Sequence, residues 1–176
     1  MPGSRPRPAG WLARMSDLPR DGHHHHATHG GPIAVTGGEV RVRPAGLDDA
    51  PAVLAFWQTA AEGTSISDDE DGVAALLRRD PEALLLAERE GELVGTVIAG
   101  FDGWRCHLYR LAVLPAARRQ GVARVLLRAA EERFLAVGGR RGDAMVLVEN
   151  ELAQHAWQAA GYGPEEQWRR WTKPLV

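Results

Sequence analysis

With 176 residues, of which 44% are apolar and 25% charged, the chain is long enough for one well-buried domain, short for two, and typical of a globular protein. Its formal net charge of −2 gives no overall attraction to nucleic acid or to an anionic membrane, and it lacks the apolar run of about 18 residues that a membrane-spanning helix needs. Cys106 is the only cysteine, which excludes an intrachain disulfide, and without the apolar core of a signal peptide the expected location is the cytoplasm.

Residues 1–38 are rich in Pro, Gly, Arg and His and show neither a helical nor a strand period. Such a segment cannot bury enough apolar surface to offset the entropy of ordering it, so we predict a disordered tail. Within it, the imidazoles of His23–His26 and His29 could gather a transition metal, but no cysteine or carboxylate pattern completes a site. A solvated histidine tract is the favoured interpretation, and no metal cofactor is expected.

The domain is expected over residues 39–176 and begins with a strand at 39–43, where Val and Arg alternate until Pro44. Apolar residues on one face, behind two acidic residues, predict a helix over 50–61. Ser67 and Glu70 form a capping box that predicts the start of a second helix. The acidic run over 68–71 is expected mainly from the helix dipole, although it could also attract a cationic amine.

Three apolar strands follow, over 84–87, 93–99 and 106–113, and the glycine-containing turns between them predict an antiparallel meander.

The clearest helical period of the chain runs from Gly121 to Gly138. Beyond it we expect a buried strand at 145–148, a helix at 151–160 and a final strand at 168–173. The order of elements, without an internal repeat, predicts an α/β fold in which helices cover a sheet.

The stretch 111–123 carries the most specific signal, reading Leu-Ala-Val-Leu-Pro-Ala-Ala-Arg-Arg-Gln-Gly-Val-Ala. An apolar strand leads here into a tight turn that opens an amphipathic helix, and Gly121 at the bend lets the backbone approach a ligand closely. A helix N-terminus offers unpaired N–H groups and the positive end of the helix dipole. The turn is therefore a candidate seat for a pyrophosphate, although the turn alone does not identify the cofactor.

The same stretch resembles the coenzyme-A loop of the GNAT superfamily of N-acetyltransferases, which reads Arg or Gln, two residues, Gly, one residue, then Gly or Ala. Arg118, Gly121 and Ala123 match this pattern in the strand, turn and helix context that the family requires. The resemblance covers residues 39–176. It implies a mixed, mainly antiparallel sheet with splayed central parallel strands, covered by helices on both faces, and acetyl-CoA as the cosubstrate.

The resemblance also implies which residues hold the cosubstrate. The pantetheine arm would hydrogen-bond to the main chain at Leu111, Ala112 and Val113, where the strand bulges away from its parallel neighbour, and Asn150 would reach the arm from the end of that neighbour. The pyrophosphate would be ringed by Arg118, Arg119, Gln120, Gly121, Val122 and Ala123.

The sequence departs from the family pattern at Trp157. Many relatives carry a tyrosine there that protonates the departing thiolate, and an indole N–H cannot take over that role. Packing of Trp157 against coenzyme A is still compatible with the pattern, and because a thiol has a pKa of about 8.5, water could supply the proton. Cys106 has no recognisable His and acid partners and is interpreted as a small strand residue rather than a nucleophile.

An amine must lose a proton before or as it attacks a thioester, and His107 is the candidate general base. It lies four residues before Leu111, where relatives with a Glu or His base on this strand place it. Tyr109 could orient a water molecule or serve as a substitute acid. Strand alternation predicts one face with His107, Tyr109 and Leu111 and another with Leu108 and Arg110. The alternative, that His107 only packs on the sheet, stays open at this point.

These observations favour an N-acetyltransferase that moves an acetyl group from acetyl-CoA to a primary amine by direct attack in a ternary complex. The acceptor could be a small-molecule amine, a peptide N-terminus or a lysine. The missing tyrosine motivates an alternative, an acyl-CoA-binding sensor or interaction module without turnover, whereas the net charge disfavours acylation of aminoacyl-tRNA. No nucleic-acid or membrane partner is expected, and a homodimer is compatible with the resemblance because dimers are frequent in the family.

Overall fold

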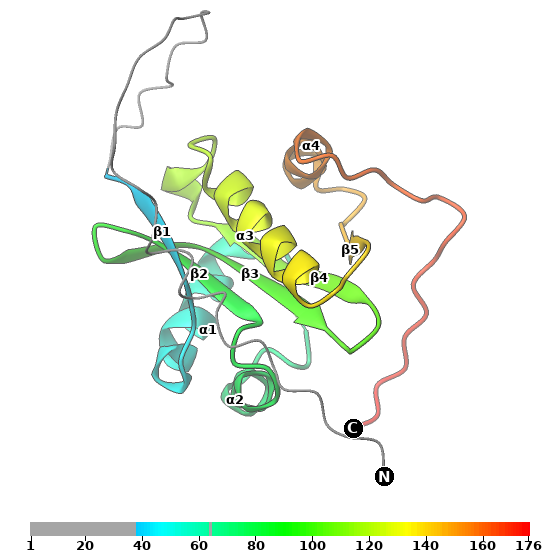
Figure 1. Cartoon of the computed structure of the whole chain (residues 1–176), viewed down its shortest axis with the longest axis horizontal. Helices are drawn as coiled ribbons and strands as arrows, with labels where there is room; N and C mark the ends of the chain where they lie inside the picture. Colours follow the sequence, from blue (N-terminus) through cyan, green and yellow to red (C-terminus); the bar gives the residue numbers. More distant parts are fainter. Residues whose placement is uncertain (1–37, 64) are drawn as a thin grey trace, which may run out of the picture. The chain divides into compact units, whose positions relative to one another are not determined.

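The computed structural model describes residues 38–63 and 65–176. The predicted tail lies outside the described residues, apart from Gly38 at its end. Among the described residues the chain forms one sheet and four α-helices, arranged as in Figure 1. None of these helices is both long and apolar enough to cross a bilayer.

The sheet has five strands, and their spatial order follows their order in the chain. Strands β1 to β4 pair antiparallel as the predicted meander, whereas β5 runs parallel to β4. The bounds are β1 Val40–Pro44, β2 Leu84–Arg89, β3 Glu92–Phe101, β4 Cys106–Val113 and β5 Gly142–Ala144. A two-residue turn joins β2 to β3, and its residues Glu90 and Gly91 both have positive φ, as a tight hairpin turn requires.

The helices cover both faces of the sheet, with α1 and α2 on one face and α3 on the other (Figure 1). Their bounds are α1 Ala50–Ala60, α2 Glu70–Arg79, α3 Val122–Ala136 and α4 Glu151–Ala159. Short 3-10 turns at Leu47–Asp49 and Pro115–Ala117 lead into α1 and toward α3.

Alternation along β2 divides its side chains between two hydrophobic cores. Leu85 and Ala87 face the core that includes α3, whereas Leu84 and Leu86 face the core beneath α1 and α2. All four are at most 2% exposed, and each buried leucine stabilises the fold by about 1.5–3 kcal/mol. The predicted class, an α/β sheet with helices on both faces, is confirmed.

The start of α2 differs from the predicted capping box. Asp69, not Ser67, is the N-cap, and its Oδ1 accepts a hydrogen bond from the Gly72 amide at 2.7 Å. The carbonyl oxygen of Ser67 lies only 2.2 Å from where a Cβ on Gly72 would stand, so the chain before α2 folds back over its first turn. That fold leaves the Asp69 carboxylate nearest to the free amides of the helix.

Two strands expected near the C-terminus do not form. Residues 145–148 follow β5 as irregular chain, with Met145 65% and Val148 89% exposed, because β5 pairs with β4 only up to Ala144. Residues 168–173 form no strand either, and Trp168 and Trp171 are 72% and 92% exposed. The two indoles stand three positions apart, so a strand would point them to opposite faces and could not bury both in one core.

Candidate functional site

Strand β4 contains a bulge at Arg110. In its pairing with β3, Thr96 lies opposite Ala112 and Ile98 opposite Tyr109, so β4 holds one extra residue between these pairs. Arg110 has a φ of 51°, in the left-handed region that non-glycine residues rarely occupy. Bulges of this kind bend a strand and are common beside functional sites.

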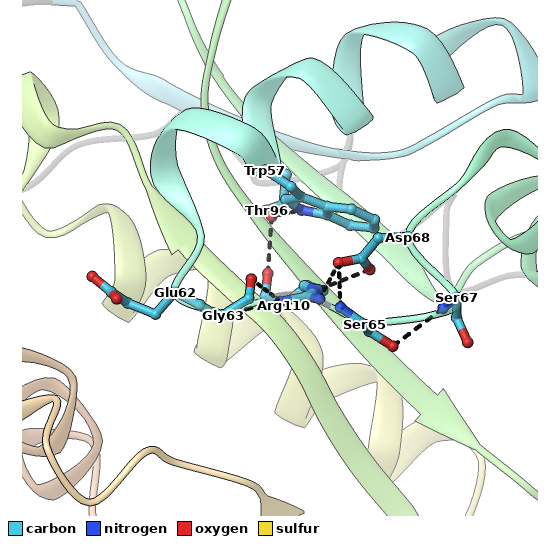
Figure 2. A network of polar contacts seen from close by, with 8 residues as sticks. All are labelled: Trp57, Glu62, Gly63, Ser65, Ser67, Asp68, Thr96 and Arg110. Atoms are coloured by element: carbon cyan, nitrogen blue, oxygen red, sulfur yellow. Dashed lines mark hydrogen bonds and ion pairs between the residues drawn. The ribbon is translucent and has the colours of Figure 1, made fainter. Parts of the chain in front are cut away.

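Buried hydrogen bonds hold the bulge in place, as Figure 2 shows. The Trp57 indole N–H donates to the Thr96 hydroxyl at 2.9 Å, and that hydroxyl donates to the Arg110 carbonyl oxygen, also at 2.9 Å. Thr96 is fully buried. Because a buried hydroxyl must find partners, α1 and β3 together stabilise the strained backbone of β4.

The bulge separates β4 from its parallel neighbour. Pairing with β5 is limited to Cys106, His107 and Leu108, which lie opposite residues 142–144. Beyond Leu108, the edge of β4 from Tyr109 to Val113 has no strand beside it on that side among the described residues. We call Tyr109–Val113 the open edge of β4, and its main chain can hydrogen-bond an extended ligand.

The bulge also overturns the predicted alternation of β4. Cys106 and Leu108 face the α3 core, which places His107 and Tyr109 on the α1 and α2 side. After the extra residue the phase changes, so that Leu111 packs against the α3 core while the Arg110 side chain lies beside α1. The expectation that Leu111 shares a face with His107 was wrong, because alternation holds only in a strand without a bulge.

The turn after β4 exposes backbone amides. Arg119 and Gly121 have φ values of 63° and 84°, and Gly121 is the N-cap of α3. The amides of Gly121, Val122 and Ala123 donate to no acceptor among the described residues. A Cβ built on Gly121 would meet no atom within 4 Å, so this side of the turn is open. Free amides at the positive end of a helix suit an anion.

The longer side chains of this turn stabilise the turn itself. The Arg118 Nε donates to the Val113 carbonyl oxygen at 3.3 Å. The Gln120 amide donates to the Ala116 carbonyl oxygen at 3.2 Å and accepts a hydrogen bond from Nη1 of Arg89, on β2, at 2.5 Å. The side chains of Arg118 and Gln120, both predicted to contact a pyrophosphate, are therefore hydrogen-bonded within the protein, and the free groups of this turn are its main-chain amides.

His107 lies between two carboxylates. Its Nδ1 is 2.6 Å from Asp143 Oδ1, on the facing strand β5, and its Nε2 is 3.6 Å from Asp102 Oδ2. Its side chain is 28% exposed. Asp102 also accepts hydrogen bonds from the amides of Arg105 and Trp104, which lower the pKa of its carboxyl group. A carboxylate on Nδ1 orients the ring and leaves Nε2 as the second functional nitrogen.

Tyr109 is a half-exposed neighbour of this pair, with its ring centroid 6.0 Å from that of His107. Partial burial, followed by the negative charges of Asp143 and Asp102, raises the pKa of its hydroxyl. The phenol is therefore protonated at neutral pH and can donate a hydrogen bond or a proton.

Of the two remaining predicted site residues, one precedes α4 and the other lies within it. Asn150 is the N-cap, and its Oδ1 accepts a hydrogen bond from the Ala153 amide at 2.9 Å. Trp157 is 8% exposed in the α3 core and packs edge-on against Tyr162, with ring centroids 5.0 Å apart. Burial raises the pKa of Tyr162 to about 12. Trp157 therefore offers a ligand little surface.

Cys106 is buried in the α3 core, and burial raises the pKa of its thiol. A protonated, enclosed thiol is a poor nucleophile, in agreement with its interpretation as a small strand residue. Within residues 38–63 and 65–176, no group of three or more His, Cys, Asp or Glu side chains is arranged to hold a metal ion.

The chain therefore combines a mainly antiparallel α/β sheet with a bulged strand that leaves its parallel neighbour and a turn of free amides at a helix start, a feature that suits an anion such as a phosphate. Residues 51–162 match the acetyltransferase (GNAT) family, and the chain belongs to this family. The predicted family, with its acyltransferase class of enzyme, is confirmed.

Known relatives agree with this assignment. The chain is 35% identical over 115 residues to an acetyltransferase of Pectobacterium atrosepticum, covering 65% of this chain and 82% of that protein. An aminoglycoside N-acetyltransferase solved with CoA is 20% identical, with a TM-score of 0.62 over 80% of this chain and 99% of that one. A PaiA N-acetyltransferase of Thermoplasma acidophilum, solved with coenzyme A, is 16% identical, with a TM-score of 0.63 over 72% and 91% of the two chains. At these identities the two structures show a shared fold.

Proposed function

We propose that the protein transfers the acetyl group of acetyl-CoA to a primary amine by direct attack in a ternary complex. The observation that carries the proposal is that two candidate binding surfaces follow one another along the chain, the open edge of β4 and the turn of free amides at Gly121–Ala123, and that Arg118 of the turn donates a hydrogen bond to Val113 at the end of β4. An extended pantetheine chain fits the first surface and a pyrophosphate fits the second. When bound, acetyl-CoA supplies an acetyl thioester.

The residues around these surfaces fit that cosubstrate. Main-chain groups of Leu111 and Val113 hydrogen-bond the pantetheine, and the free amides at the start of α3 donate hydrogen bonds to the pyrophosphate. Because Gly121 carries no Cβ and faces open space, phosphate oxygens can approach its amide. The free Nδ2 group of Asn150 donates to the pantetheine, while its Oδ1 caps α4.

His107 acts as the general base in this proposal, and Asp143 orients it. With Nδ1–H donated to Asp143, the lone pair of Nε2 is free to take a proton from the acceptor ammonium group. Asp102, 3.6 Å from Nε2, stabilises the protonated ring after that transfer. This arrangement favours a catalytic role for His107 over simple packing on the sheet.

Tyr109 is the proposed acid. As the amine nitrogen bonds to the acetyl carbon, the carbon–sulfur bond breaks and the sulfur needs a proton. The raised pKa of Tyr109 keeps its hydroxyl protonated, and Tyr109 belongs to the strand edge along which we propose that the pantetheine lies. Trp157 is buried and has no acidic hydroxyl, so Tyr109 replaces the tyrosine of other relatives.

The acceptor is a primary amine of a small molecule, a peptide N-terminus or a lysine. A test is to incubate the protein with acetyl-CoA and a panel of amines, polyamines, amino acids and peptides while measuring thiol release. Acetyl-CoA-dependent release with at least one amine, reduced about a hundredfold in His107→Gln, supports the proposal. Tight acetyl-CoA binding without release on any acceptor would instead favour the sensor.

A further inference from the structure

The Arg110 side chain leaves the bulge on the α1 and α2 side of the sheet and reaches the connection between these helices (Figure 2). Its Nε donates to Asp68 Oδ1 at 3.1 Å, and its Nη2 donates to Asp68 Oδ2. Its Nη1 donates to the carbonyl oxygens of Glu62 and Gly63, each at 3.4 Å. The guanidinium therefore holds both ends of what we call the α1–α2 connection, namely Glu62, Gly63 and Ser65–Asp68.

This ion pair is well enclosed. The side chains of Arg110 and Asp68 are 13% and 21% exposed, and the guanidinium carbon lies 5.7 Å from the centroid of the Trp57 ring. An enclosed ion pair stabilises a structure only when its donors and acceptors are satisfied, and here each guanidinium nitrogen has an acceptor. The bidentate geometry of the Arg110–Asp68 pair fixes the orientation of the connection as well as its distance from β4.

Arg110 is the polar anchor of the connection. In the part of the chain that the structure describes, every hydrogen bond between the connection and the sheet comes from this side chain. The connection's other bonds are local, such as the Ser65 amide to Asp68 at 3.1 Å. Ile66 is 71% exposed. Without the guanidinium, the described residues of the connection would have no hydrogen bond to β4.

The anchored connection lies on the face of the sheet that carries His107 and Tyr109. We propose that Arg110 is a positioning residue for the acceptor: its guanidinium holds the α1–α2 connection as a fixed wall beside the open edge of β4, where the amine approaches. This inference rests on the proposed function for the identity of the acceptor. The anchoring itself rests only on the contacts of Arg110.

A glycine substitution separates the backbone role of Arg110 from that of its side chain. Glycine adopts a φ of 51° freely, so Arg110→Gly keeps the bulge while it removes the side chain with its guanidinium. Asp68→Asn removes the charge of the partner while keeping its shape. Arg105→Gly is a matched control, because the Arg105 side chain is exposed and donates no hydrogen bond to the described residues.

The experiment measures hydrogen exchange of the connection in the full chain by mass spectrometry. We expect amides of Ser65–Asp68 to exchange about tenfold faster in Arg110→Gly and in Asp68→Asn, and unchanged in Arg105→Gly. Ethylguanidinium in the buffer should restore protection in Arg110→Gly by occupying the vacated position, and should have no effect on Asp68→Asn.

Two further readouts separate this inference from the proposed function. Calorimetry with acetyl-CoA should give affinities within about threefold of each other for wild type and Asp68→Asn, because Asp68 lies in the α1–α2 connection and not on the open edge of β4. With the amine that gives the fastest thiol release, Arg110→Gly should raise KM about tenfold while kcat falls less than about threefold. Unchanged exchange in both variants, or faster exchange without ethylguanidinium rescue, would overturn the inference. Failure of wild type to bind acetyl-CoA would instead overturn the proposed function, and the exchange data would still decide the anchoring.

Discussion

Gly121→Glu tests the anion site at the start of α3. Gly121 has a φ of 84°, where a side chain costs about 1–2 kcal/mol of backbone strain, but its Cβ would meet no atom within 4 Å. The variant should therefore fold. A glutamate at the N-terminus of a helix is favourable to the dipole, which offsets part of the strain.

The effect on binding follows from charge. Two like unit charges about 4 Å apart repel by about 4 kcal/mol at an effective dielectric constant of about 20, and solvent at this exposed turn reduces that to about 2–3 kcal/mol. Because about 1.4 kcal/mol corresponds to a tenfold change, we expect the acetyl-CoA Kd to rise about 30- to 150-fold in calorimetry.

Gly138→Glu provides the control for this variant. Gly138 follows the other end of α3, has a φ of 86°, and also faces open space. A glutamate there meets the same strain and the negative end of the helix dipole, so it destabilises the fold at least as much. Equal acetyl-CoA affinity in wild type and Gly121→Glu, with both variants folded, would refute the anion site. Equal weakening in the two variants would attribute the effect to stability instead.

Three further predictions concern other parts of the chain. His107→Gln should lower turnover about a hundredfold and Asp143→Asn about tenfold, and acetyl-CoA affinity in calorimetry should be unchanged in both. A wild-type rate in His107→Gln would show that His107 is not the base and that water takes the proton. Arg89→Met should weaken acetyl-CoA binding about fivefold, because it removes the hydrogen bond from Arg89 to Gln120. Adding Gln120→Leu to this variant should weaken binding no further, whereas additive losses would show that the two residues act independently. The pKa of Asp49 is lowered to about 2, chiefly by its hydrogen bond from Arg43, so Asp49 stabilises the fold above about pH 4 and loses that effect as pH falls through 2. Asp49→Asn should therefore cost about 1 kcal/mol in urea unfolding at pH 7 and less than about half of that at pH 2, and an undiminished cost at pH 2 would contradict this origin.

The sequence predicts the parts of the site that depend on local pattern. The strand, turn and helix around Gly121 are encoded within about a dozen neighbouring residues, by an apolar run, a glycine and a helical period. The meander and the helix of 121–138 are predictable for the same reason. The family resemblance then supplied the bulge and the expected role of the turn.

Features that depend on pairing between distant strands were beyond such reasoning. The contact of His107 with Asp143 is set by the register of β4 against β5, across 36 positions, and Asp143 lies in β5, before the segment 145–148 where the apolar pattern had predicted a strand. The exact position of the bulge could not be predicted from the sequence either, and Leu111 was therefore assigned to the wrong face of β4. A charged Arg110 within an apolar strand was the available signal, because a buried charge implies a partner and a special position.

The central claim is that an acetyl group moves from acetyl-CoA to an amine nitrogen. Its most direct test is to incubate the protein with acetyl-CoA labelled with deuterium in the acetyl group, together with the amine panel, and to analyse the amines by mass spectrometry. The account predicts a deuterated acetyl group on at least one amine, and its near absence when Gly121→Glu replaces wild type. Bound or consumed acetyl-CoA without any labelled amine would contradict it.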